Sequence, residues 1–383
     1  MNSADSTQNS RLPGLDGLRG LACLMVFLYH LRWNAQPSNS EPLQLPAGPF
    51  NVEFLLRKFD IGVAIFFILS GLLLSLPFWR AILANEPAPD TSRYLWRRAC
   101  RIVPAYYAVL TAIYLIRGGT YTLYGAIDFL LHASFLHPFA DYAYYGVHPD
   151  LWTIGIEFQF YLLLPLIMRG VGAVFRKAGA VASIAVLVLT CWGIDFAAGA
   201  TLRALAPHIP DRFLTENGTV ISGTVFSYLK LFAFGIAAAF AVLRAHFSKA
   251  QADAVCALSA VAAGAVVTLG DEAGWRTMGT FGWPLNALVL GTFAASLARS
   301  HYFAQLFSTR WIAATGTISY GIYLWHDLVL HAVYAGTLRG NLSGWPLFLT
   351  GGAIALAVTI AIASLSWRFI ERDALAAPYP SFR

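Results

Sequence analysis

Charged side chains are scarce in this sequence. Lys, Arg, Asp and Glu make up 12% of its 383 residues, whereas soluble globular proteins carry about 25%. Hydrophobic residues make up 57%, and the mean hydropathy is +0.59. This composition excludes an ordinary soluble domain and indicates a polytopic membrane protein. The net charge of +6 does not by itself point to nucleic acid, because the basic residues must first be placed against the membrane.

Cysteine is also scarce, with four residues in the chain. Each lies in or beside an apolar run, and no two form a C-x-x-C pair. The sequence therefore favours neither a disulfide framework nor a zinc site, and we expect no bound metal. The four residues are Cys23, Cys100, Cys191 and Cys256.

Signals for a cleaved leader are missing as well. Residues 1–12 form a polar N-terminal tail without a basic segment, and no small-residue cleavage site follows the first apolar run. We therefore expect the first apolar run to remain as a helix.

Long apolar runs are abundant and define the expected fold. They predict an all-α membrane bundle of about ten transmembrane helices, in a single domain that covers residues 1–383 and ends in a tail at 374–383. The predicted spans are 18–33, 61–79, 102–116, 151–168, 178–199, 219–243, 252–270, 280–299, 311–334 and 345–367.

A weaker apolar stretch at 123–136 is too short to be assigned by length alone. With ten spans, most of the 26 Lys and Arg residues fall on the side of the N-terminus. Counting 123–136 as a crossing would move several of them to the other side. The positive-inside rule therefore favours ten spans with both termini cytoplasmic, and an interfacial or re-entrant helix at 123–136.

The first apolar run, Leu15 to His30, has a polar stripe. As an α-helix it places Arg19 and His30 on one face, about 16 Å apart along the axis, with Asp16 within about 60° of the same line. In lipid such a face turns toward protein or a water-filled cavity. The alternative is a cytoplasmic anchor at Arg19 and an interfacial histidine at the other end.

Two further charged residues lie inside predicted spans. Glu157 lies about two turns into its span, and Lys230 lies in the middle of another. Ionisable groups at such depth are costly and mark functional sites by default. The alternative is a buried ion pair between Glu157 and Lys230 that holds two helices together, which does not exclude a role in a site.

A second histidine lies in the span 311–334. Ser319, Tyr323 and His326 are spaced i, i+4 and i+7, so they share one helix face, and Asp327 follows directly. This face predicts a polar contribution to the same cavity.

Arginines cluster at the start of another span. Arg93, Arg97 and Arg101 form an i, i+4, i+8 stripe, and Arg98 with Arg101 forms an R-x-x-R pair. Several guanidinium groups at one helix end can bind phosphates bidentately. The alternative is positive-inside anchoring or contact with anionic lipid.

These features fit two classes of protein. One is an enzyme that takes an activated group from a cytoplasmic, nucleotide-like donor and gives it to an external acceptor. The other is a transporter or flippase of an anionic or acylated lipid or sugar. Transporters more often show broken helices in symmetric halves, and the titratable residues here do not repeat in that way.

The order of motifs along the chain resembles the acyltransferase type 3 family. The resemblance extends from Arg11 to about Asp373. The segments that carry it are LDGLRGLACLMVFLYH, FFILSGLLLSLPFWR, RYLWRRACRIVPAYY, LWTIGIEFQFYLLLPL, GTISYGIYLWH and SWRFIERDA. The matched positions are Arg19 and His30 (R-x10-H), Arg98 and Arg101 (R-x-x-R), and Glu157 as the acid of a motif usually written WSLxxE. Thr153 replaces the serine of that motif.

Members of that family are membrane-bound O-acyltransferases. The resemblance implies an acyl-CoA, commonly acetyl-CoA, as a cytoplasmic co-substrate, with no permanently bound cofactor. It also implies a hydroxyl acceptor on a carbohydrate or a glycosylated molecule, and a multi-pass protein in the lipid bilayer of the bacterial inner membrane. The donor would be bound by Arg19, Arg97, Arg98 and Arg101.

Acyl transfer to a hydroxyl needs a base, a group that stabilises the oxyanion, and a site for the donor. His30 is the expected base, since histidine titrates near neutral pH, and it could itself carry the acyl group. Glu157 or Asp16 would orient His30 or balance the charge of its helix face. The oxyanion could be stabilised by Lys230, Tyr323 or His326, and the sequence does not choose among them.

Overall fold

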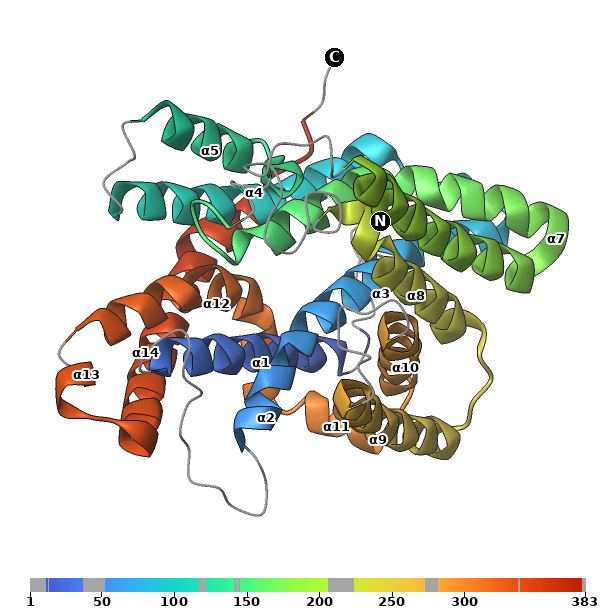
Figure 1. Cartoon of the computed structure of the whole chain (residues 1–383). Helices are drawn as coiled ribbons and strands as arrows, with labels where there is room; N and C mark the ends of the chain where they lie inside the picture. The colour runs from blue at the N-terminus through green and yellow to red at the C-terminus, as the bar shows by residue number, and fades with distance from the viewer. Residues whose placement is uncertain are drawn as a thin grey trace, which may run out of the picture.

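The computed structural model describes residues 12, 14–36, 52–116, 122–140, 143, 145–205, 224–272, 282–336 and 338–380. Within these ranges the regular structure is helical and contains no strand (Figure 1), which confirms the predicted all-α class. The predicted tail at 1–12 lies outside the described residues except for Leu12. Of the predicted tail at 374–383, the first residues belong to the last helix and 381–383 lie outside the described part.

The helices occur in the following order along the chain. They are α1 (Leu15–Ala35), α2 (Val52–Arg57), α3 (Ile61–Ala84), α4 (Thr91–Ile116), α5 (Leu123–Ala133), α7 (Leu151–Leu205), α8 (Val225–Arg244), α9 (Lys249–Glu272), α10 (Gly282–Leu297), α11 (Tyr302–Phe307), α12 (Arg310–Ala335), α13 (Leu338–Asn341), α14 (Gly344–Ser366) and α15 (Arg372–Ala376). Short 3-10 turns lie at Lys58–Asp60 and His137–Phe139, and a π-helical turn at Trp367–Glu371 joins α14 to α15.

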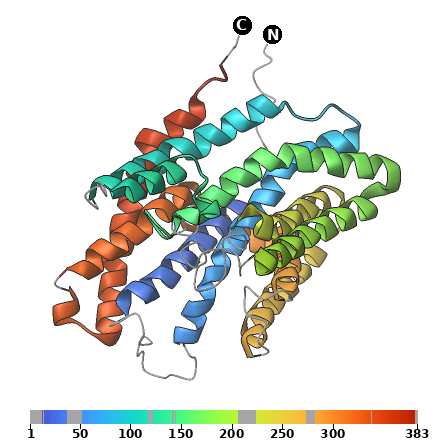
Figure 2. The same ribbon diagram turned by 45° about the horizontal axis from the view of Figure 1, so that its top comes forward.

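Six of the described helices are long and apolar enough to cross a membrane. One of them, α7, contains two of the predicted spans, because the chain turns back on itself at Gly179 (Figure 2). Gly179 has φ 79°, a left-handed conformation that glycine adopts without steric cost. The protein is therefore a helical membrane bundle, and the count of ten crossings stays a prediction.

Glycines bring α1 into close contact with α12 and with the end of α11 that precedes it. A Cβ atom at Gly17 would collide with the carbonyl of Phe307, one at Gly20 with the backbone of Gly316, and one at Gly316 with the carbonyl of Asp16. Small residues at such crossings let helix backbones approach each other. The glycines of the LDGLRG segment therefore serve packing, and they fix the face that α1 presents to α12.

The weak apolar stretch at 123–136 forms a short helix, α5, as predicted. It lies beside α4 (Figure 1). The hydroxyl of Tyr106 donates to the carbonyl of His132 at 2.9 Å, and that of Tyr107 donates to the carbonyl of Ala133 at 2.6 Å. These bonds satisfy carbonyls at the C-terminal end of α5, which have no partner within the helix.

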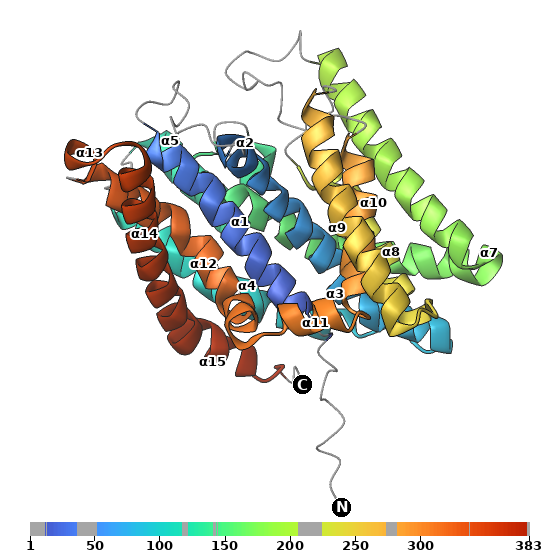
Figure 3. The same cartoon turned by 90° about the horizontal axis from the view of Figure 1, so that it is seen from below.

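The start of α1 and helix α15 lie at one end of the bundle, and the C-terminal end of α1 lies with α2 at the other (Figure 3). An even number of crossings would place the two ends of the chain in this way. Which end faces the cytoplasm stays a prediction.

Candidate functional site

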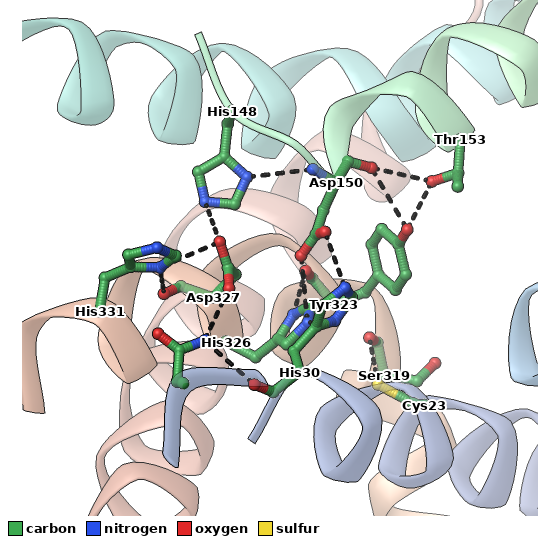
Figure 4. A network of polar contacts seen from close by, with 11 residues as sticks. Cys23, His30, His148, Asp150, Thr153, Ser319, Tyr323, His326, Asp327 and His331 are labelled. Atoms are coloured by element: carbon green, nitrogen blue, oxygen red, sulfur yellow. Dashed lines mark hydrogen bonds and ion pairs between the residues drawn. The ribbon is translucent and has the colours of Figure 1, made fainter. Parts of the chain in front are cut away.

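Two histidines and one aspartate meet where the C-terminal half of α1, helix α12 and the start of α7 converge (Figure 4). His30 Nδ1 lies 2.9 Å from His326 Nε2. Asp150 Oδ1 lies 3.2 Å from His30 Nε2, and its Oδ2 lies 3.2 Å from His326 Nε2. The side chains of Asp150 and His326 are buried, whereas that of His30 is 21% exposed. His30 is thus the histidine of this cluster that solvent reaches.

The hydrogen bonds of the cluster define its protonation. His326 Nδ1 lies 2.7 Å from the carbonyl of Tyr323, so this nitrogen carries a proton and donates it. In the neutral ring, His326 Nε2 then accepts from His30 Nδ1–H. The lone pair of a neutral His30 is therefore on Nε2, beside the Asp150 carboxylate. A proton that His30 takes up at Nε2 is stabilised there by Asp150.

Tyr323 and Thr153 hold the backbone of Asp150. The Tyr323 hydroxyl donates to the Asp150 carbonyl at 3.2 Å, and the Thr153 hydroxyl donates to the same carbonyl at 3.1 Å. The two hydroxyl oxygens lie 2.7 Å apart. The threonine of the WTIGIE segment therefore helps to position a carboxylate that the sequence reasoning had not singled out.

A second layer surrounds the cluster. His148 Nε2 and His331 Nδ1 each lie 3.2 Å from Asp327 Oδ2, and the Asn34 amide donates to the carbonyl of His30 at 3.0 Å.

The carboxyl of Asp150, in the loop before α7, has a raised pKa. The larger cause is burial, and the second is the negative charge of Asp327. Asp150 therefore accepts a proton more readily than an exposed aspartate.

The same atoms have the spacing of a metal site. His30, Asp150 and His326 offer ligand atoms that all lie within 4.8 Å of one another, and so do His148, Asp150 and Asp327. Hydrogen bonds and ion pairs account for the arrangement of His30, Asp150 and His326 without a metal ion, because each histidine nitrogen in it has a hydrogen-bonding or charged neighbour. The absence of a metal stays a prediction.

Two cavities lie on either side of one wall. The histidine cavity, of about 190 Å³, includes His30 and Asp150, and the arginine cavity, of about 330 Å³, includes Arg19, Arg98 and Arg101. Val63 and Tyr323 line both cavities. The histidine cavity is also lined by Tyr29, Tyr145, Trp152, Tyr228 and Asn286, and the arginine cavity by Asp16, Arg80, Thr153 and Glu157.

Three of the four arginines predicted to bind the donor line the arginine cavity. Arg19 is 3.5 Å from Asp16, and Arg101 is 3.9 Å from Glu371. Among the described residues, Nε of Arg98 is buried without a hydrogen-bond partner. The fourth, Arg97, is exposed and does not line the cavity, so the structure does not bring it together with the other three. Arg80, which the sequence reasoning did not select, lines it instead.

The two carboxylates expected to orient His30 lie elsewhere. Glu157 accepts hydrogen bonds from the hydroxyls of Ser70 and Tyr161, and Asp16 pairs with Arg19. Both line the arginine cavity, and the carboxylate that contacts His30 is Asp150. Neither Glu157 nor Asp16 therefore orients His30 directly, whereas the pairing of Asp16 with Arg19 is consistent with charge balance on that helix face.

Lys230 does not pair with Glu157. Its Nζ lies 2.6 Å from Asp195 Oδ2, with side chains that are 9% and 18% exposed. Asp195 lies in the second limb of α7, so the pair joins that limb to α8. Of the three candidates for the oxyanion donor, Tyr323 lines both cavities, whereas Lys230 and His326 line neither.

Replacement of Lys230 by methionine is expected to lower the free energy of unfolding by roughly 1–3 kcal/mol, because it leaves the partly buried Asp195 carboxylate without its ion-pair partner. Thermal or SDS denaturation of the purified protein measures this loss. The double variant Lys230→Met, Asp195→Leu should recover most of it. Arg372→Met is the control, since its pair with Asp373 is exposed. Equal stability of the single variant and the wild type would contradict a structural role for the pair.

Comparisons with known proteins agree with the motif pattern. The model of a family described as "Acyltransferase domain" matches residues 12–364. The chain is 25% identical over 390 residues to "O-acetyltransferase OatA" of Staphylococcus aureus (strain NCTC 8325 / PS 47), and equally so to the protein of that name from strain COL. Each match covers 94% of this chain and 56% of the relative, so the chain spans little more than half the length of these relatives. No solved structure matches.

Proposed function

The chain belongs to this acyltransferase family, and on that premise we propose that it is an integral membrane O-acyltransferase with His30 as its general base. The donor is an acyl-CoA, and the relatives' printed names favour acetyl as the acyl group. The acceptor is a hydroxyl of a carbohydrate or of a glycosylated molecule. The protein would act in the inner membrane of a bacterium.

One observation carries this proposal. His30 lines a cavity that shares Val63 and Tyr323 with a second cavity, which is lined by arginines. Transfer between a phosphate-bearing thioester and a separate hydroxyl acceptor needs two adjoining binding spaces, one for each substrate. The thioester end of the donor would extend from the arginine cavity toward His30.

The residues then act as follows. The acceptor oxygen attacks the thioester carbon while His30 Nε2 takes the hydroxyl proton, and Asp150 stabilises the imidazolium. The carbon–sulfur bond breaks, and the CoA thiolate leaves and receives that proton from His30. Tyr323 lines both cavities and is the proposed donor for the oxyanion of the tetrahedral intermediate; its hydroxyl would turn from the Asp150 carbonyl, which Thr153 would continue to bind.

The arginine cavity is the proposed donor site. CoA carries several phosphates, and guanidinium groups bind phosphate oxygens in pairs. Arg98 offers a buried Nε without a hydrogen-bond partner in the described part of the chain, which is a group suited to an anionic ligand. Arg19 and Arg101 border the same space.

Removal of the Arg98 guanidinium should weaken CoA binding by about 1.5–3 kcal/mol, the scale of a hydrogen bond to a charged group. Arg98→Lys should recover only part of this loss, because an ammonium cannot form the bidentate fork. Isothermal titration of the purified protein with CoA measures the affinity. Arg97→Ala is the matched control, one residue away but exposed and outside the cavity. Equal affinities of the two alanine variants would assign Arg98 to membrane anchoring.

The proposed activity is tested with purified protein in nanodiscs, supplied with acetyl-CoA and a panel of saccharides. Transfer releases the CoA thiol, which a thiol reagent detects, and adds an acetyl group to the saccharide, which mass spectrometry detects. A transporter of acylated or anionic solutes would release no thiol. Folded wild-type protein that leaves both substrates intact would overturn the proposal.

A further inference from the structure

A buried amide faces the histidine cavity from α10. Asn286 is 5% exposed and lines this cavity. Its Oδ1 has no hydrogen-bond partner among the described residues. Burying a polar atom without a partner costs free energy, and such atoms in native proteins usually find one in a ligand or in ordered water. This oxygen therefore points to a ligand group that donates a hydrogen bond.

The wall of the cavity is aromatic. The rings of Trp152 and Tyr228 lie 5.3 Å apart at an interplanar angle of 40°, and Phe67 packs edge-on against both. Both rings line the cavity, as do Tyr29 and the more exposed Tyr145. Rigid aromatic surfaces of this kind bind ligands that have an apolar face and polar edges.

A sugar ring has this combination of surfaces. Its axial C–H bonds form apolar faces that pack on aromatic rings, and its hydroxyl or acetamido groups project from the edge as hydrogen-bond donors. The cavity offers an aromatic wall, a neutral amide oxygen without a hydrogen-bond partner among the described residues at Asn286, and a base at His30. A simple lipid chain could pack on the aromatic wall, but it has no hydrogen-bond donor for the buried amide oxygen of Asn286.

We propose that Asn286 is a specificity-determining residue that binds an edge hydroxyl or acetamido group of a sugar ring stacked on Trp152 and Tyr228. This contact orients the ring so that its reacting hydroxyl faces His30 Nε2. The inference rests on the proposed acyl transfer and adds to it a subsite for the acceptor. Asn286 is a positioning residue, because it contacts the acceptor away from the reacting atoms.

The variant Asn286→Leu, which has a similar shape but no hydrogen-bonding group, tests the subsite. With chitotriose and maltotriose as acceptors and acetyl-CoA as donor, the KM for the better acceptor should rise 10-fold or more. The KM for acetyl-CoA should stay within 2-fold, and kcat should change less than the acceptor KM. A structural defect would change all three constants together.

The matched control is Gln159→Met. Gln159 is also a buried amide whose oxygen lacks a partner in the described part of the chain, but it lines neither cavity and donates to the carbonyl of Phe135. Its substitution should leave the acceptor KM within 2-fold of the wild-type value. If both variants change the acceptor KM equally, or neither does, the assignment of Asn286 is overturned while the acyl transfer stands.

Direct binding of the two trisaccharides without donor separates this subsite from the chemistry. Affinity that falls 10-fold or more in Asn286→Leu and not in Gln159→Met supports the subsite. If the wild type binds a trisaccharide in this way but transfers no acetyl group, the proposed function fails and the sugar subsite remains. If the wild type neither binds nor modifies either trisaccharide, the subsite is overturned.

Discussion

Replacement of His30 by alanine is expected to lower acyl transfer by about 10²-fold or more, the usual scale for loss of a general base. The reason is that His30 lines the histidine cavity and its Nε2 lies 3.2 Å from Asp150 Oδ1, which would stabilise the proton taken up. His30→Gln should be equally inactive, because glutamine is similar in size but cannot take the hydroxyl proton. Initial rates of CoA release with a saturating acceptor measure the effect.

Binding of CoA separates a chemical defect from a folding defect. The His30 variants should bind CoA as the wild type does, since the arginine cavity lies beyond Val63 and Tyr323. His246→Gln, at an exposed position between α8 and α9, should keep full activity. If His30→Gln keeps near-normal transfer, His30 is not the base, and His326, 2.9 Å away, becomes the candidate.

Asp150→Asn is expected to lower kcat by about 10²–10⁴-fold, as losses of an orienting carboxylate beside a catalytic histidine do. Asp150 contacts both His30 Nε2 and His326 Nε2. An amide keeps the size of the side chain but cannot stabilise an imidazolium. It can also donate to His30 Nε2 and so occupy the basic lone pair.

The kinetic constants distinguish this role from a general disturbance of the site. The KM for acetyl-CoA should stay close to the wild-type value, because Asp150 does not line the arginine cavity. Thr153→Val, which removes one of the two hydroxyls that bind the Asp150 carbonyl, should cause a smaller loss of kcat. If Asp150→Asn retained half of the wild-type kcat, the carboxylate would have no part in proton transfer.

Features that depend on one helix could be predicted from the sequence. The period of the α-helix places Arg19 and His30 on one face of α1 and Tyr323 with His326 on one face of α12. The apolar runs likewise located the helices, including the short helix α5. In each case the geometry is local, so no knowledge of neighbouring helices is required.

Features that depend on which helices are neighbours could not be predicted. Lys230 pairs with Asp195 rather than with Glu157 because the second limb of α7 carries an acid beside α8. The arginine stripe of α4 could be recognised in the sequence, but the side of α4 that borders the cavity could not. That orientation places Arg98 in the lining of the arginine cavity and Arg97 outside it.

Asp150 was missed because it lies in a loop. No periodic pattern assigns a direction to a loop side chain, and its partners come from two other helices that are distant in sequence. The available signal was its position directly before the WTIGIE segment, with His148 two residues earlier. Two polar, titratable residues at the entrance of an apolar span indicate a candidate site.

The wall formed by Val63 and Tyr323 also bears on the electrical insulation of the membrane. A continuous column of water through a bundle of this kind would conduct ions and dissipate the voltage across the bilayer, which is worth about 2.3 kcal/mol per elementary charge at 100 mV. Val63 and Tyr323 line both cavities and so lie where such a column would pass. Under the proposed function, the protein would join reactants from the two sides of the bilayer while these side chains limit the flow of ions between the cavities.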